Sequence, residues 1–298
     1  MEETVNNVIK RTIVTLIFVP LLITSLFLSF GNYILLFSFM IFATVIGQME
    51  MMDLMKRKNI SVNKVIFLSL TLLPPVLSYI YHLPLLQNNP YIKFYSYLFS
   101  IIIYIIYIAI MTLDILKEKL DTSFEKTGFL LIAILFPSIC ISFTFFILNI
   151  HVEKFDKLGS FLLLLFIFIV WANDIFAYIF GLLFGKNNII GFSISPKKSW
   201  AGYIGGLVSA CFFSSLLYFV ARDYFPFHYA EILILAVILS ITGDLGDLFE
   251  SLLKRSCHVK DSGTIIVAMG GVLDSIDSTL FSLPLYYFLL KLFINKPF

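Results

Sequence analysis

Carboxylates and basic side chains crowd together near the C-terminus of an otherwise apolar chain. The acidic members are Asp247, Asp261, Asp274 and Asp277, and the basic residues interspersed with them are Lys254, Arg255 and Lys260. Charged residues make up only 13% of the chain, and a chain this apolar keeps ionisable groups at an energetic cost. The mixture is suited to a site that holds a metal ion together with a polyphosphate.

The spacing of the carboxylates predicts a metal site. Asp274 and Asp277 are three residues apart at the start of the last apolar segment, so their side chains can converge on a helix. Mg²⁺ prefers oxygen ligands and usually leaves coordination positions open for phosphate and water. The predicted ligands are Asp247, Asp274 and Asp277, with Asp174 and Asp244 as further candidates and a second cation left open.

Ion pairing within one helix is the alternative interpretation of this stretch. Glu250 and Lys254 are four residues apart, and with Asp247 and Ser251 they would share a helix face. Such pairs contribute about 0.5 kcal/mol or less. They would not explain two carboxylates three residues apart without a nearby cation, so we favour the metal site.

An ionisable residue, Asp174, lies in the middle of an apolar segment. Such a group normally faces a polar cavity or a partner. Asn173 precedes it, and Tyr178 follows four residues later on the same helix face. The alternative is a hydrogen-bonded polar pair that holds helices together, and we favour a functional role.

The loop at 193–200 combines hydroxyls and lysines between two apolar segments. Ser199 is placed to cap the helix that follows. Ser195, Lys197 and Lys198, together with helix N-terminal amides, would form an anion site. A basic loop beside anionic lipid headgroups explains the same residues equally well.

The composition places the chain among integral membrane proteins. It has 298 residues, of which 59% are hydrophobic, and a mean hydropathy of +0.95, whereas soluble domains are about half apolar. A net charge of +2 argues against a nucleic acid partner, and the three cysteines have no spacing that indicates a disulfide framework or a zinc site. The predicted fold is all-α, a polytopic bundle of about nine transmembrane helices. It forms a single membrane domain, with N-terminal helices in 1–158 and catalytic helices and loops in 159–298.

Nine apolar segments approach the roughly 20 residues that a helix needs to cross a bilayer. They are 12–30, 33–48, 65–81, 95–113, 128–149, 160–185, 203–221, 232–243 and 272–294. The eighth is short, so its helix is expected to continue into the polar run from Asp244, and Gly31 with Asn32 predicts a tight turn between the first two.

The basic residues indicate how the chain is oriented in the membrane. With the N-terminus inside, most of the 21 Lys and Arg residues fall in cytoplasmic segments, which places both polar loops, 186–199 and 244–271, on the cytoplasmic side.

Two stretches of the chain carry polar residues in a distinctive order and spacing. The longer one consists of Ser251-Leu-Leu-Lys-Arg, Lys260-Asp261-Ser-Gly263 and Gly270-Gly271-Val272-x-Asp274-x-Ile276-Asp277. The upstream one consists of Asn173-Asp174, Ala177-Tyr178, Gly185-Lys186 and Ile194-Ser-Pro-Lys-Lys-Ser-Trp200. Together they resemble the signature segments of the phosphatidate cytidylyltransferases (CDP-diacylglycerol synthases). The resemblance covers about residues 170–280, whereas the N-terminal half agrees only in being a bundle of spans.

The resemblance implies a nucleotidyltransferase that makes CDP-diacylglycerol and pyrophosphate from CTP and phosphatidate. It implies Mg²⁺ as the cofactor and CTP, phosphatidate and membrane lipids as partners, with a homodimer left open. The location implied is a bacterial inner membrane, with the active site facing the cytoplasm. The catalytic residues implied are Asp247, Asp261, Asp274, Asp277 and Lys260. The substrate-binding residues implied are Asn173, Asp174, Ser195, Lys197, Lys198, Ser251, Lys254, Arg255, Gly270 and Gly271.

The chain also departs from the family pattern at several polar positions. Ala201 stands where the family typically has Glu, Met269 where it has His, and Ser275 where it has Arg. Val267 replaces Pro or Gly, and Ile175 replaces Thr. All predicted metal-ligand carboxylates are present, so we expect an intact metal site with fewer supporting polar groups. The two alternatives are a weakly active or inactive homologue that binds nucleotide or lipid as a scaffold, and an ion-coupled transporter.

Overall fold

The described part of the chain is helical throughout. A computed structural model describes residues 16–83, 120–263 and 270–294, and within these ranges the only β-type pairings are isolated bridges. Seven helices in these ranges are long and apolar enough to cross a membrane. The all-α prediction is therefore confirmed, and the chain is a multi-pass membrane protein.

The chain divides into two compact units. The first contains residues 1–146 and 261–275, and the second contains 147–260 and 276–298. The long C-terminal helix begins in the first unit and continues in the second. The predicted single membrane domain stays a prediction.

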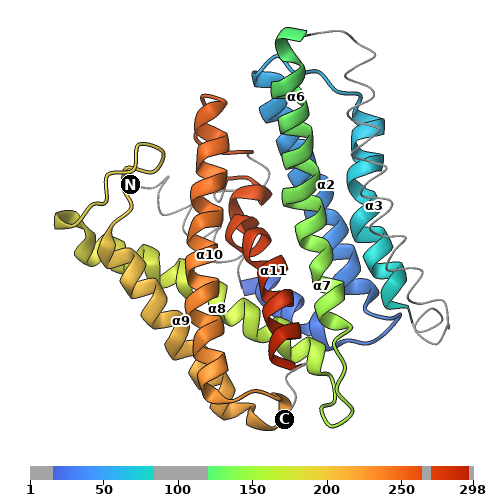
Figure 1. Cartoon of the computed structure of the whole chain (residues 1–298), viewed down its shortest axis with the longest axis vertical. Helices are drawn as coiled ribbons and strands as arrows, with labels where there is room; N and C mark the ends of the chain where they lie inside the picture. The colour runs from blue at the N-terminus through green and yellow to red at the C-terminus, as the bar shows by residue number, and fades with distance from the viewer. Residues whose placement is uncertain (1–15, 84–119, 264–269, 295–298) are drawn as a thin grey trace. The chain divides into compact units, whose positions relative to one another are not determined.

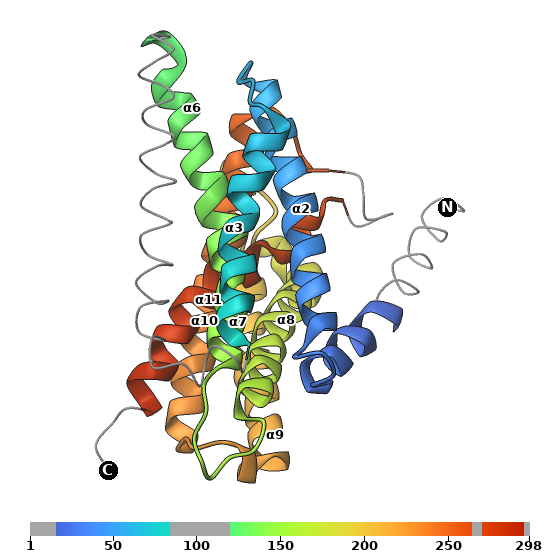
Figure 2. The ribbon, with the colours of Figure 1, turned by 90° about the vertical axis from the view of Figure 1, so that its right-hand side faces the viewer.

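The first unit is built around helices that run alongside one another (Figures 1 and 2). They are α2 (Ile34–Arg57), α3 (Lys64–His82), α6 (Leu120–Ala133), a π-helical segment (Ile134–Ile139) and α7 (Cys140–Leu148). The turn before α2 places Gly31, Asn32 and Tyr33 in the left-handed region, as expected for the tight connection predicted there. Asn63 Oδ1 caps α3 by accepting hydrogen bonds from the Val65 and Ile66 amides.

The second unit contains the helices that carry most of the predicted site. They are α8 (Leu158–Phe184), a 3-10 turn (Gly185–Asn187), α9 (Trp200–Val220), a second 3-10 turn (Arg222–Tyr224) and α10 (Tyr229–Ser256). The last helix of the chain, α11 (Val272–Ile294), lies mainly in this unit. In the described residues, α8 packs against both α9 and α10 (Figure 1).

The observed helices agree with most of the predicted spans. Helix α10 is continuous over 28 residues, which confirms that the short eighth span extends into the polar run. The predicted span 95–113 lies outside the described residues. The span 12–30 is described only in part, and there the structure has the shorter helix Leu16–Phe27. The count of nine is therefore not confirmed.

Glycines allow the helices of the second unit to approach closely. A Cβ atom at Gly206 in α9 would lie 2.7 Å from Asn173 Oδ1 in α8, and one at Gly246 in α10 would lie 2.8 Å from the Asp277 carbonyl oxygen in α11. Small residues at such positions let helix backbones pack tightly in membranes. Both contacts involve residues of the predicted site, Asn173 through its side chain and Asp277 through its backbone.

Candidate active site

Asn173 in α8 links this helix to the acidic part of α10. Its Nδ2 donates a hydrogen bond of 3.1 Å to Asp244 Oδ1. The amide is buried, whereas the next side chain, Asp174, is exposed, as is Tyr178 one turn later. Asp174 nevertheless interacts with the side chains of Asn173 and of Ser278 in α11, so this face of α8 adjoins the neighbouring helix.

Asp277 brings α11 into the same acidic region of the second unit. Its side chain is buried, and its Oδ1 accepts a hydrogen bond of 2.7 Å from the Ser278 amide. Asp247 and Asp174 both lie near enough to Asp277 for their charges to interact with it. The charge of Asp174 also interacts with those of Asp244 and Asp247. Carboxylates from three helices therefore share one region.

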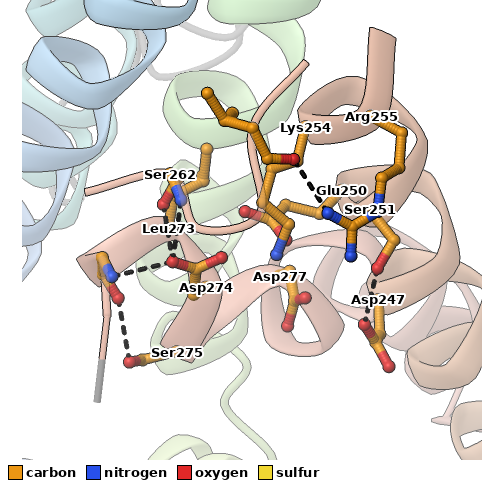
Figure 3. Close-up of polar contacts among 12 residues, drawn as sticks. Asp247, Glu250, Ser251, Lys254, Arg255, Ser262, Leu273, Asp274, Ser275 and Asp277 are labelled. Atoms are coloured by element: carbon orange, nitrogen blue, oxygen red, sulfur yellow. Dashed lines mark hydrogen bonds and ion pairs between the residues drawn. The ribbon is translucent and has the colours of Figure 1, made fainter. Parts of the chain in front are cut away.

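Lys198 is the basic side chain seen to pair with these carboxylates in the second unit. Its Nζ lies 2.6 Å from Asp247 Oδ2, and Asp247 Oδ1 is 3.4 Å from the Ser251 hydroxyl (Figure 3 shows Asp247 and Ser251). Lys198 also lies over the ring of Tyr203, with its Nζ 5.3 Å from the centroid. Burial acts to lower the pKa of Lys198, but the Asp247 carboxylate together with Tyr203 and Asp244 outweighs burial, so the pKa lies above its ordinary value.

The loop before α9 determines which of the two adjacent lysines reaches Asp247. The Ile190 amide donates to the Lys198 carbonyl at 2.9 Å, and the Ser195 amide donates to the Phe192 carbonyl at 3.1 Å, which folds the loop back on itself. Ser199 caps α9 through its Oγ, which accepts from the Gly202 amide at 3.2 Å, as predicted. Lys197 is consequently exposed, while Lys198 is partly buried against the carboxylate.

The basic end of α10 makes internal contacts in this structure. Lys254 pairs with Glu250, whose side chain is fully buried. The ion pair that the sequence offered as an alternative is therefore formed. Arg255 donates to the Val259 carbonyl at 2.9 Å and to the Ile194 carbonyl at 3.4 Å. The predicted phosphate-binding roles of both residues remain predictions.

In the first unit, Asp274 is held by backbone and hydroxyl donors. Its Oδ2 accepts hydrogen bonds from the Gly271 amide at 2.7 Å, the Ser262 amide at 3.0 Å and the Ser262 hydroxyl at 3.0 Å (Figure 3). The Gly271 contact is the return half of a capping box, in which a first-turn carboxylate satisfies the amide that begins the helix. Gly270, with φ +96°, allows the sharp turn that brings this amide into place.

Glu50 in α2 is a buried carboxylate that the sequence reasoning did not identify. It accepts hydrogen bonds from the amides of Val272 and Leu273 at 2.9 and 2.8 Å, and from the Ser262 hydroxyl at 3.2 Å. The predicted span ended at residue 48, which left Glu50 outside it, whereas α2 continues to Arg57. An ionisable group inside an apolar helix is the signal that would have identified it.

Three further predicted site residues lie in loops and are at least partly exposed. Ser195 is partly exposed, and Lys260 and Asp261 are exposed. Ser275 is also exposed, and its hydroxyl donates to the Gly271 carbonyl at 3.1 Å. Two positions that depart from the family pattern, Val267 and Met269, lie outside the described residues.

The chemistry of the second unit's donor set fits a divalent cation. Asp174, Asp244, Asp247 and Asp277 supply oxygen ligands of the kind that Mg²⁺ and similar ions prefer, and Lys198 partly balances their charge. Across the described ranges, however, no three acidic, His or Cys side chains are already gathered around one point. The ligands therefore fit the ion in kind, and binding would require them to draw closer together.

Comparison with known proteins yields a family match that extends over nearly the whole chain. The sequence profile of the Cytidylyltransferase family matches residues 9–293. A phosphatidate cytidylyltransferase of Bacillus subtilis is 36% identical over 186 residues, which is 62% of this chain and 66% of that protein, just under two thirds of its length. The enzyme of that name from Rickettsia bellii is 32% identical over 64% of this chain and 82% of its own length. Another, from Aquifex aeolicus, is 31% identical over 56% of this chain and 58% of its own.

Proposed function

This chain belongs to the cytidylyltransferase family, and we propose that it transfers the cytidylyl group of CTP to phosphatidate, giving CDP-diacylglycerol and pyrophosphate. The relatives described above carry that activity in their names. The observation that carries the proposal is the acidic region of the second unit, where Asp247 pairs with Lys198 beside Asp277. A reaction between two anions requires both a cation-binding group and a phosphate-binding group, and this region offers both.

The proposed reaction exchanges one phosphorus–oxygen bond for another. A phosphate oxygen of phosphatidate attacks the α-phosphorus of CTP, and the bond from that phosphorus to the β-phosphate oxygen breaks as pyrophosphate leaves. The second pKa of a phosphate monoester is about 6, so the attacking oxygen is already largely ionised near neutral pH. The chain therefore needs no dedicated general base.

The acidic side chains are proposed to hold a divalent cation, with Mg²⁺ the specific ion. When bound, such an ion neutralises phosphate charge and stabilises the charge that develops on the leaving group. Asp247 and Asp277 are the proposed ligands within the second unit, with Asp174 and Asp244, whose charges interact with that of Asp247, as further candidates. Asp274 remains a proposed ligand because it precedes Asp277 by one helical turn on α11.

The lysines are proposed to hold phosphate groups. Lys198 can release Asp247 to a cation and turn to a phosphate, because its four-carbon side chain is flexible. Ser195 and Lys197 lie in the same folded loop and would supply further donors. Lys254, Arg255 and Lys260 are the proposed contacts to the CTP phosphates, at and beyond the end of α10.

The proposed site faces the cytoplasm of a bacterial inner membrane. The support is the distribution of Lys and Arg, which favours cytoplasmic positions for the loops that contain these residues. CTP is present on that side. Sealed vesicles with the cytoplasmic face outward would test the placement. They are expected to react with added labelled CTP before permeabilisation, because CTP reaches only outward-facing sites.

The activity can be tested with the purified full chain in detergent. Labelled CTP, phosphatidate and Mg²⁺ are expected to give equal amounts of CDP-lipid and pyrophosphate, and Asp247→Asn is the matched inactive control. No CDP-lipid from the wild type, under conditions in which the Bacillus subtilis relative is active, would contradict the proposal. The comparisons do not favour the scaffold and transporter alternatives.

A further inference from the structure

We propose that Glu50 is a positioning residue for the catalytic helix α11, acting by fixing the first turn that carries Asp274. The inference goes beyond the proposed function and rests on it only in taking Asp274 as a ligand of the divalent cation. Glu50 lies in α2, more than 200 residues before the segment that it contacts. It does not belong to either stretch that carries the family resemblance.

The first support is the number of donors that converge on one buried carboxylate. Glu50 is 2% exposed, and burying an unpaired charge is costly unless donors satisfy it. Each of its two oxygens accepts an amide hydrogen bond, from Val272 and from Leu273. These amides belong to the first turn of α11, where they have no partner within the helix and where the helix dipole favours an anion.

The second support is a hydroxyl that connects Glu50 to Asp274. Ser262 Oγ lies 3.2 Å from Glu50 Oε2 and 3.0 Å from Asp274 Oδ2. A serine hydroxyl carries one proton, so it can donate to only one of the two carboxylates at a time. Glu50 and Asp274 therefore compete for this donor, and a change in one alters how firmly the other is held.

The third support comes from two glycines whose space the carboxylate uses. A Cβ atom at Gly271 would lie 2.6 Å from Glu50 Oε2, and a Cβ atom at Gly263 would collide with Glu50 Oε1. Gly47, one turn before Glu50, lies near the Leu273 side chain. Residues 262–263 and 271–273 therefore lie directly against α2, and Glu50 is the buried carboxylate that contacts both segments.

Binding of Mn²⁺ alone, followed by electron paramagnetic resonance, tests the proposal without requiring turnover. In the full-length protein, Glu50→Gln keeps the shape of the side chain but replaces one acceptor with a donor. Loss of a residue that orients a metal ligand typically weakens metal binding about 10- to 100-fold, so the Mn²⁺ dissociation constant is expected to rise at least about tenfold. The Mg²⁺ concentration for half-maximal activity is expected to rise in parallel, with a smaller change in the KM for CTP.

Asp53→Asn is the matched control, because Asp53 lies on the same helix but is exposed and pairs with Lys56 at the surface. It is expected to bind Mn²⁺ as the wild type does. A role for Glu50 in bundle stability alone would lower the thermal unfolding midpoint but leave the Mn²⁺ affinity of the folded protein unchanged. That result would overturn the proposal, as would a wild type that binds no Mn²⁺.

A second variant covers the case in which Glu50→Gln does not fold. Ser262→Ala keeps Glu50 and removes the shared hydroxyl, and it is expected to weaken Mn²⁺ binding by about threefold. Wild-type affinity in this variant would then overturn the proposal. If Mn²⁺ binding depends on Glu50 but the wild type forms no CDP-lipid, only the proposed function is refuted. If the wild type is active but Glu50→Gln binds Mn²⁺ as the wild type does, only the role of Glu50 is refuted.

Discussion

The two units hold their carboxylates in opposite ways. In the first, Glu50 and Asp274 are satisfied by backbone amides and by the Ser262 hydroxyl. In the second, Asp247 is bound directly by the ammonium of Lys198, and Asp277 lies within range of the charge of Asp247. Amides are fixed dipoles that position a carboxylate, whereas a flexible ammonium can be exchanged for another cation. The comparison separates carboxylates that fixed donors orient, including the proposed ligand Asp274, from carboxylates whose ammonium partner a metal ion could replace.

The largest expected effect comes from removing an available carboxylate. Asp247→Asn or Asp277→Asn is expected to lower kcat/KM about 1,000-fold or more, because a bound cation contributes several kcal/mol of charge stabilisation. Steady-state assays with labelled CTP would measure this loss, with gel filtration to show that the variants are folded. A loss no greater than that in Glu50→Gln would break the distinction between the two groups.

The next effect concerns Glu250, a carboxylate in the second unit that is satisfied by an ion pair. Lys254→Met leaves Glu250 buried without its lysine, which is expected to destabilise the protein by about 3–5 kcal/mol. Glu250→Gln combined with Lys254→Met is expected to recover most of the thermal unfolding midpoint in detergent. Recovery of stability without recovery of activity would assign Lys254 to phosphate binding, whereas recovery of both would leave it a structural role.

A smaller effect is expected at the exchangeable lysine itself. Lys198→Met removes a charged donor, which is expected to raise the KM for CTP or for phosphatidate about tenfold. It should also tighten Mn²⁺ binding, because Asp247 then has no competing ammonium. Lys197→Met is the matched control, since Lys197 is exposed, and equal effects of the two substitutions would contradict the assignment.

The smallest expected effect is on stability at alkaline pH. The pKa of Lys198 is raised in the folded protein, so its ion pair contributes fully below the ordinary lysine value of about 10.4. That contribution is lost as the pH rises through the raised pKa. The wild-type unfolding midpoint should therefore fall more than that of Lys198→Met in this range, by on the order of a degree or two. Parallel pH profiles would show that the pair adds nothing to stability.

Parts of the site follow directly from sequence patterns. The four-residue spacing of Glu250 and Lys254 offered their ion pair as the alternative interpretation, and the pair is formed. Ser199 was correctly predicted to cap α9. These features depend on neighbours within one helix turn, so local geometry is enough to predict them. The long α10 was predicted for a similar reason, because the apolar pattern led directly into helical spacing of polar residues.

Other parts depended on contacts between residues far apart in the chain. An ionisable group inside an apolar helix could have singled out Glu50, but its partners could not be predicted because they lie at residues 262–273. The sequence also could not separate Lys197 from Lys198, because the direction of each side chain depends on how the loop folds back through Ile190 and Ser195. No periodicity in a single segment contains this information.

The sequence by itself determined that the chain forms apolar helices and which acidic and basic groups they carry, because helix formation and membrane partitioning follow from local residue types. Only the tertiary structure decided how each charge is balanced. Asp274 and Glu50 meet amides at the start of α11, while Asp247 meets the ammonium of Lys198. The reason is that a buried charge must be satisfied by whichever donors packing brings to it, and those donors come from distant segments.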